Sequence, residues 1–268
     1  LGEAGNWTAS PKAVSEWFPA KERGLAIGIY TAGTPIGMTL APLFIIWLAG
    51  AWGWRSAFVV TGLLGLVWLV PWVFLYRPVK KHPLLNEAER TWICSNSASE
   101  SQATGERGWT WLEAFGRVEV WCLLVGRMFS DPIWFFYQNW YPKYLVSERG
   151  LTQADVKITW VMFLAAGLGS LVGGWLAGRF IKAGRAPERV RLFVMLGCAI
   201  FMPLSPLVAM ASSTEFSLAF ASLIVFMHLA WLTNISALVV DVVPSPSLGT
   251  VFGIVAAGSS VGAMAMND

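Results

Sequence analysis

Ionisable residues inside long apolar runs are the first candidates for chemistry in this sequence. Glu3 lies in the first run, and His228 lies in a late one. Arg127 and Asp131 lie four residues apart in a central run. A charged side chain at the centre of a bilayer costs about 2.5 to 3.5 kcal/mol on insertion scales, so such groups are protonated, paired or exposed to water.

Each of these groups has a functional and a structural interpretation. Glu3 is either a carboxyl group that gains and loses a proton as the protein changes state or a structural carboxyl near the water interface. Arg127 and Asp131 face each other on a helix and can pair. They form either a gating pair or a self-neutralising pair beside the kink at Pro132. His228 is either a proton site or a packed neutral imidazole.

Polar and aromatic residues at helical spacing are candidate ligand contacts. Trp134, Tyr137 and Tyr141 are three and four residues apart, so a regular helix places them on one face. The stripe suits a ligand that needs hydroxyl partners and an aromatic wall, and it is equally typical of aromatic packing. Tyr30 and Thr34 also lie four residues apart and form a second candidate pair.

A third set lies deep in a late apolar run. Trp231, Thr233 and Asn234 are predicted to form a polar patch there, suited either to hydroxyl recognition or to hydrogen bonds between helices. Lys12 is predicted to extend toward the membrane surface, and Asp241, shortly before Pro244, is interpreted as an interfacial carboxylate.

The motifs of several other functional classes are absent from the sequence. There is no GxxxxGK[ST] loop for ATP, and Ser259-Ser260 lacks the GxSxG context of a nucleophile. The three cysteines and two histidines do not have the spacing of metal ligands. We therefore expect no enzyme, no metal and no cofactor.

The composition predicts what positions these residues. Of 268 residues, 56% are apolar and 13% are charged, against about a quarter charged in soluble domains. Sixteen Trp and 26 Gly are typical of a protein that lies in a lipid bilayer. The net charge of +3 gives no indication of a nucleic-acid partner.

Eight apolar runs have the length or partial length of a membrane-spanning helix, which needs about 20 residues. They cover residues 1–17, 24–49, 54–76, 118–146, 156–181, 190–211, 216–243 and the segment from 248 onward. Because spans in lipid must bond their own amides, and these runs are too long for barrel strands, an all-α polytopic bundle follows. The first and last runs are interpreted as incomplete, so we expect the sequence to be a fragment.

Basic residues predict the orientation, because cytoplasmic loops carry an excess of Lys and Arg. One set of alternate connections holds Lys21, Arg23, Arg77, Lys80, Lys81, Arg90, Arg107, Arg117, Arg179, Lys182, Arg185, Arg189 and Arg191. The opposite set holds only Arg55, Lys143, Arg149 and Lys157. The first set is therefore predicted to be cytoplasmic, in a multi-pass protein of the inner membrane.

Three sequence motifs resemble a known family. They are Gly2-Glu3-Ala4-Gly5-Asn6 with Lys21-Glu22-Arg23-Gly24, then Asp131-Pro132-Ile133-Trp134-Phe135-Phe136-Tyr137 with Trp140-Tyr141-Pro142-Lys143, and Gly173-Gly174-Trp175-Leu176-Ala177-Gly178-Arg179 with Gly184-Arg185. The chain resembles the anion:cation symporter branch of the major facilitator superfamily, and the second motif resembles hexuronate carriers in particular. The third departs from the family pattern at Gly178, where an acidic residue is usual, so a charge latch at that loop is in doubt.

The resemblance implies an arrangement of the chain. It assigns residues 1–76 to helices four to six, residues 77–117 to a cytoplasmic linker between two halves, and residues 118–268 to helices seven to eleven. By the same resemblance, Glu3 carries the coupled proton. The resemblance favours Tyr137 and a substrate contact near Thr34, and Asn6 is grouped with the expected substrate-binding residues.

We therefore expect a secondary transporter of a small organic anion. The preferred substrate is a hexuronate or related sugar acid, moved together with a proton by alternating access in a protein expected to be a monomer. Another carboxylate, such as an aldonate, aldarate or aromatic acid, stays open as the substrate. So does a membrane fragment without transport activity.

Overall fold

The computed structural model describes residues 2–79, 82–93, 107–152 and 155–267, with the side chains of residues 2–4, 6, 266 and 267 left out. Within these ranges the chain is helical and contains no β-strand. The expected all-α membrane bundle is therefore confirmed.

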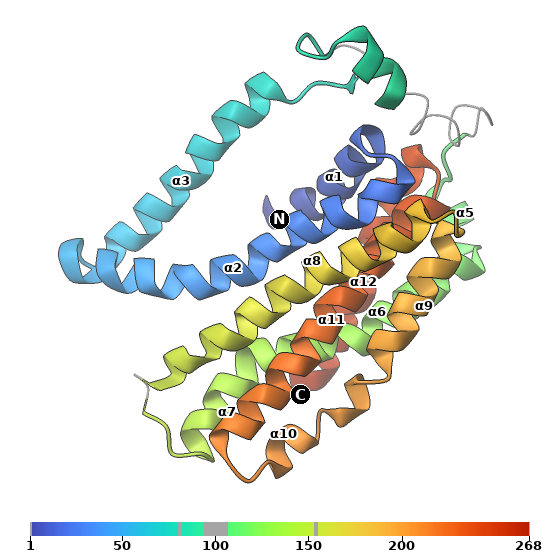
Figure 1. The fold of residues 1–268 in the computed structure, drawn as a ribbon. Helices are drawn as coiled ribbons and strands as arrows, with labels where there is room; N and C mark the ends of the chain where they lie inside the picture. The colour runs from blue at the N-terminus through green and yellow to red at the C-terminus, as the bar shows by residue number, and fades with distance from the viewer. Residues whose placement is uncertain (1, 80–81, 94–106, 153–154, 268) are drawn as a thin grey trace.

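The bundle is built mainly from helices that run side by side (Figure 1). These are α1 (Gly2–Trp17), α2 (Ala20–Trp52), α6 (Val118–Phe135), α7 (Tyr141–Ser147), α8 (Trp160–Lys182), α9 (Pro187–Ala199), α11 (Thr214–Val242) and α12 (Leu248–Asn267). The shorter elements are a helix at residues 87–93, α5 (Trp111–Phe115), a π-helical turn (Phe136–Trp140), α10 (Leu207–Met210) and 3₁₀ turns at Asp155–Thr159, Met202–Leu204 and Ser245–Ser247.

Helix α11 forms the centre of the bundle, with α2, α6, α8 and α9 packed around it. Every residue from 228 to 240 is buried, so this stretch has no face toward the surroundings. A helix that is apolar on all sides must lie inside a protein or a membrane. The polar residues on α11 are therefore held at the core, where each needs a partner or a ligand.

Within the described ranges, five helical segments are long and apolar enough to cross a membrane. They are Ala20–Trp52, Trp54–Leu75, Asp155–Lys182, Thr214–Val242 and Ser245–Ala265. The expected span at 190–211 is not one continuous helix, because α9 ends at Ala199 and a 3₁₀ turn and α10 follow. Pro203 and Pro206 explain this difference, since proline lacks the amide hydrogen that a continuing helix needs.

Small residues bring three pairs of helices into close contact. A Cβ atom added at Gly174 of α8 would lie 2.1 Å from the carbonyl oxygen of Gly24 in α2. One added at Gly173 would lie 2.6 Å from the Cα of Ala230 in α11, and one at Gly262 of α12 would lie 2.1 Å from the Met128 carbonyl oxygen in α6. Helices in lipid associate through such small-residue contacts.

The helices α2 and α8 approach each other at one end and diverge at the other. At residues 24–35 of α2 the contact is tight, and the Ser170 hydroxyl donates to the Gly28 carbonyl oxygen at 3.1 Å. Residues 40–47 of α2 are exposed, and the two helices separate in this direction (Figure 1). We call the tight end the basic end, because the turn around Lys21 and the connection from Arg179 to Arg191 lie there.

The segment between α3 and α6 contacts the helical bundle near its beginning and near its end. His82 stacks edge-on against Trp17 at 5.1 Å, and the Lys21 ammonium lies 5.6 Å from the Trp92 ring. Near α5, the Trp109 amide donates to the Ser247 hydroxyl at 2.6 Å. A capping box begins α5, and hydrogen bonds from Thr110 lower the pKa of the Glu113 carboxyl group.

Helix α3 (Trp54–Leu75) turns back from α2 at Gly53, whose φ of 82° favours glycine. It packs mainly against α2 and stands apart from the other long helices in Figure 1. Of its residues only Ala57 is buried, and most of the others are apolar and exposed, as suits contact with lipid or another helix.

Candidate functional site

A buried ion pair on α6 begins the candidate site. Arg127 Nε donates to Asp131 Oδ2 at 2.6 Å, and the two residues are 9% and 3% exposed. The pairing predicted from their four-residue spacing is therefore confirmed. Pairing lowers the cost of placing two charges in a low-dielectric environment. Whether the pair also has a gating role stays a prediction.

His228 of α11 extends this pair into a cluster. Its Nε2 lies 3.9 Å from Asp131 Oδ1, and the side chain is almost completely buried. The imidazole lies between the rings of Trp134 and Trp231, stacked on both at centroid distances of 6.4 and 6.3 Å. We call Arg127, Asp131, Trp134, His228 and Trp231 the central cluster.

Polar atoms without partners gather around the central cluster. Among the described residues, both ring nitrogens of His228 and the buried Tyr30 hydroxyl have no hydrogen-bond partner. The Arg127 guanidinium lies 6.0 Å from the Trp7 ring of α1. A buried polar group without a partner is costly, so these groups suit a site that a polar ligand or water completes.

The structure keeps part of the predicted aromatic stripe, because the ring centroids of Tyr137 and Tyr141 lie 5.8 Å apart, while Trp134 has other partners. Trp134 contacts Phe163 of α8 as well as His228, whereas the Tyr137 hydroxyl bonds with the Ser205 hydroxyl at 2.7 Å. Tyr141 turns toward Ser217 at the start of α11, at 3.3 Å. A π-helical turn at Phe136–Trp140 breaks the regular spacing on which the prediction depended.

The predicted polar patch on α11 is also divided between two faces. Trp231 lies on the α6 side, close to Gly126. Asn234 faces α8 and donates to the Gly173 carbonyl oxygen at 3.1 Å, in addition to Ala230 of its own helix. Thr233 is fully buried, and its hydroxyl has no partner among the described residues. The bond to Gly173 favours the helix-to-helix interpretation of Asn234.

The remaining predicted site residues are Thr34 of α2 and Glu3 and Asn6 of α1. Thr34 of α2 is exposed, one turn beyond Tyr30. Glu3 and Asn6 belong to α1, but their side chains lie outside the described residues. Their roles stay predictions from the resemblance.

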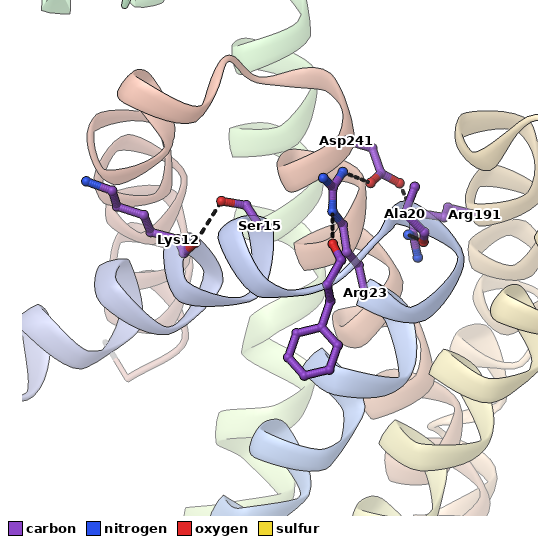
Figure 2. Close-up of polar contacts among 7 residues, drawn as sticks. Lys12, Ser15, Ala20, Arg23, Arg191 and Asp241 are labelled. Atoms are coloured by element: carbon purple, nitrogen blue, oxygen red, sulfur yellow. Dashed lines mark hydrogen bonds and ion pairs between the residues drawn. The ribbon is translucent and has the colours of Figure 1, made fainter. Parts of the chain in front are cut away.

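Figure 2 shows a second buried charge cluster, at the basic end, which joins three helices. Asp241 of α11 accepts from Arg23 Nη1 of α2 at 3.1 Å and from Arg191 Nε of α9 at 2.5 Å. All three side chains are at most 6% exposed. Asp241 is thus buried between two arginines, and its interfacial depth in the membrane stays a prediction.

Backbone contacts complete this basic-end triad of Arg23, Asp241 and Arg191. Arg191 Nη2 donates to the Ala20 carbonyl oxygen at 3.2 Å, and Arg23 Nε donates to the Phe18 carbonyl oxygen at 3.1 Å. The triad therefore fixes the turn between α1 and α2 to the ends of α9 and α11. The Lys12 amine points away from the triad, and Lys12 is exposed, as predicted (Figure 2).

The sequence contained a signal for the triad. The charge pattern places Arg23 and Arg191 in the connections between helices. The glycine at position 178, where the family usually has an acidic residue, argues against a charge latch at this end. Yet Asp241 is a lone carboxylate at the end of an apolar run, where burial requires a cation. A charge network does form there. It uses Asp241 of α11, while Gly178 provides close packing, since an added Cβ would lie 3.0 Å from the Lys21 carbonyl oxygen.

Residues 1–266 match the family model described as Major Facilitator Superfamily. The chain is 31% identical over 206 residues to a galacturonate transporter of Dickeya chrysanthemi, covering 75% of this chain and 59% of that protein. It is 28% identical over 179 residues to a hexuronate transporter of Escherichia coli K12, covering 66% of this chain and 41% of that protein.

A third relative is named for a different sugar acid. The chain is 29% identical over 191 residues to a D-galactonate transporter of Escherichia coli O6:H1, covering 68% of this chain and 44% of that protein. The chain thus spans about half the length of the curated relatives it matches.

Proposed function

Because this chain belongs to the major facilitator superfamily, we propose that it is part of a secondary transporter for a sugar acid, preferably a hexuronate. The observation that carries the proposal is the central cluster, which places a buried arginine beside aromatic rings and unpartnered polar atoms. The relatives named for galacturonate, hexuronate and galactonate support this substrate class.

The chemistry of the cluster fits a hydroxylated carboxylate. Arginine offers a planar fork that can bind a carboxylate with two hydrogen bonds. Arg127 already pairs with a carboxylate, since its Nε and Nη2 both lie 2.6 Å from Asp131 Oδ2. A substrate carboxylate near Arg127 would compete with Asp131, while the Tyr30 hydroxyl and the His228 ring nitrogens are available for substrate hydroxyl groups. Trp134 and Trp231 supply apolar walls for the sugar ring.

The proposed mechanism is alternating access with proton symport in the inner membrane. The basic-end triad closes the cytoplasmic side by joining α2 to α9 and α11, while α2 and α8 diverge toward the other side. Closure at one end with divergence at the other is the arrangement of a carrier open to the outside. Breaking the triad would then let the cytoplasmic side open.

Proton coupling is assigned to Glu3, and it rests on the resemblance of the first motif. The protonated carboxyl would accompany the anion inward, so that the proton gradient drives accumulation. Aldonates and aldarates are the alternative substrates, because relatives named for galactonate and for galactarate or D-glucarate also match this chain.

Uptake by cells that express the full-length protein tests the function. We expect labelled galacturonate or glucuronate to accumulate at an external pH below that of the cytoplasm and to stop when a protonophore is added. Glu3→Gln should abolish gradient-driven accumulation while leaving exchange of internal for external substrate. Lys12→Gln, on the same helix, is the control and should accumulate normally.

Two results would contradict the proposal. Absence of uptake for every uronate, aldonate and aldarate tested, with the protein present in the membrane, would refute the substrate class. Full accumulation by Glu3→Gln would refute only the proton assignment and leave sugar-acid transport standing.

A further inference from the structure

A cavity of about 760 Å³ lies on the side of the bundle, between α8, α9 and α11. It is separate from the central cluster and from the basic-end triad, since none of their residues lines it. Its walls are apolar and include Phe180 of α8, Met227 of α11, and Phe193, Gly197 and Phe201 in or just after α9. We call it the lateral groove.

Two arginines line the groove, and both belong to the basic connection between α8 and α9. Arg185 lies in the turn after α8, and Arg189 lies in the first turn of α9. Both are exposed, and in the part of the chain that the structure describes neither forms an ion pair with a carboxylate. Arg191, two residues further on, is by contrast buried inside the bundle and paired with Asp241.

The dimensions of the groove match one leaflet of a bilayer. Helix α9 spans Pro187–Ala199, which corresponds to about 18 Å at 1.5 Å per residue. Half of a hydrocarbon core of about 30 Å is about 15 Å. With Arg185 and Arg189 at the level of the lipid headgroups, Phe201 would lie near the middle of the membrane.

Part of the lateral groove is empty because Gly197 has no side chain to fill it. A Cβ atom added at Gly197 would meet no atom within 4 Å, so the chain does not fill this space with a side chain. An extended peptide in the groove would leave backbone amides unsatisfied against apolar walls, which is costly in lipid. A hydrocarbon chain has no such groups, so an acyl chain is the occupant that suits the walls.

We propose that the lateral groove binds an anionic glycerophospholipid of the leaflet at the basic end. Its phosphate contacts Arg185 and Arg189, and one acyl chain lies along Phe193, Gly197 and Phe201. Basic pockets between transmembrane helices recognise anionic headgroups through this combination of charge and apolar depth. The stacking of Arg185 on the Phe180 ring, at 5.1 Å, holds the guanidinium at the rim of the groove.

Native mass spectrometry of the full-length protein tests the proposal. The protein is delipidated in a neutral detergent and titrated with palmitoyl-oleoyl phosphatidylglycerol or with the phosphatidylcholine of the same chains. We expect one phosphatidylglycerol to be retained about tenfold more tightly than phosphatidylcholine. Arg185→Gln with Arg189→Gln should abolish this preference, and Gly197→Leu should weaken binding of both lipids by occupying the acyl site.

Matched controls separate the groove from general effects of charge and size. Arg179→Gln removes an exposed arginine at the same end that does not line the groove, and Gly65→Leu adds a side chain at an open position on α3. Both controls should retain phosphatidylglycerol like the unaltered protein. Circular dichroism checks that every variant is folded.

Several outcomes would overturn the proposal. One is equal retention of the two lipids by the unaltered protein, and another is an equal loss of preference in Arg179→Gln. Displacement of the lipid by inorganic phosphate alone would indicate a simple anion site. A dimer that the Gly197→Leu variant disrupts, without lipid dependence, would assign the groove to a second copy. Because the readout is bound lipid mass, it does not depend on sugar-acid transport.

Discussion

At the residue scale, the two buried charge clusters differ in what they connect. Arg127 and Asp131 lie on one helix, so their pairing does not depend on how helices move relative to each other. Arg23, Asp241 and Arg191 lie on three helices, so their contacts exist only while those helices stay together at the basic end. The first cluster is suited to binding and the second to holding one conformation.

Replacing Asp241 tests the second assignment. Asp241→Asn leaves Arg23 and Arg191 buried without their carboxylate, which destabilises a buried pair by about 3 to 5 kcal/mol. We expect the basic end to open, so that the distance between spin labels at Lys21 and Lys182 increases and broadens. Glu188→Gln, an exposed carboxylate in the first turn of α9, should leave the distance unchanged. An unaltered distance in Asp241→Asn would show that packing alone closes this end.

A double-mutant cycle tests the pair on α6. Asp131→Asn alone should lower stability by about 3 to 5 kcal/mol, because Arg127 stays buried and uncompensated. Arg127→Met combined with Asp131→Asn should recover part of that loss, since no buried charge is left. Thermal unfolding in detergent measures both. Additive effects of the two substitutions would contradict the pairing.

At the scale of elements, small residues decide where helices touch. Gly24 and Gly174 bring α2 and α8 together beside the basic-end triad, and Arg191 Nη1 lies 3.0 Å from the Cβ position at Gly24. A side chain at Gly24 would therefore crowd both the Gly174 backbone and Arg191, so the contact between α2 and α8 lies directly beside the triad.

Enlarging Gly174 tests this dependence. Gly174→Ala places a methyl group against the Gly24 carbonyl oxygen, and such overpacking costs about 1 to 3 kcal/mol. We expect a lower unfolding temperature and a longer distance between labels at Lys21 and Lys182. Gly37→Ala on α2, where a Cβ meets no atom within 4 Å, is the control and should have neither effect. A tolerated Gly174→Ala would mean that α2 and α8 shift without loss.

Elements also explain where prediction from spacing failed. Regular helical spacing placed Trp134, Tyr137 and Tyr141 together. In the structure the rings of Tyr137 and Tyr141 stay neighbours, but their hydroxyls bond with Ser205 and Ser217 around a π-helical turn, and Trp134 packs elsewhere. The predicted span at 190–211 failed because two prolines end the helix. Both differences arise from backbone hydrogen bonding, which apolar periodicity does not report.

At the scale of the whole molecule, the two ends of the bundle are expected to move in opposite directions. Binding of a sugar acid at the central cluster should draw α2 toward α8 on the side away from the basic end. We predict that galacturonate shortens the distance between labels at Leu43 and Trp160 and lengthens that between Lys21 and Lys182. Mannitol, which lacks the carboxylate, is the control. Distances that change together in the same direction would contradict alternating access.

The division into two halves joined by the 77–117 linker stays a prediction. The described parts of the linker contact Trp17 and Lys21 at its beginning and Ser247 at its end. Each end is thus attached to the group of helices that it follows or precedes in the proposed division.

The sequence by itself determined the class of the protein, its helices and most of their bounds, because apolar length and the need to bond every amide in lipid leave few solutions. It also determined the Arg127–Asp131 pair, since both residues lie on one helix. Only the tertiary structure brought Asp241 between Arg23 and Arg191 and placed His228 between two tryptophans. Those contacts join residues that are distant in the chain, and their geometry depends on how closely neighbouring helices pack, which no local pattern encodes.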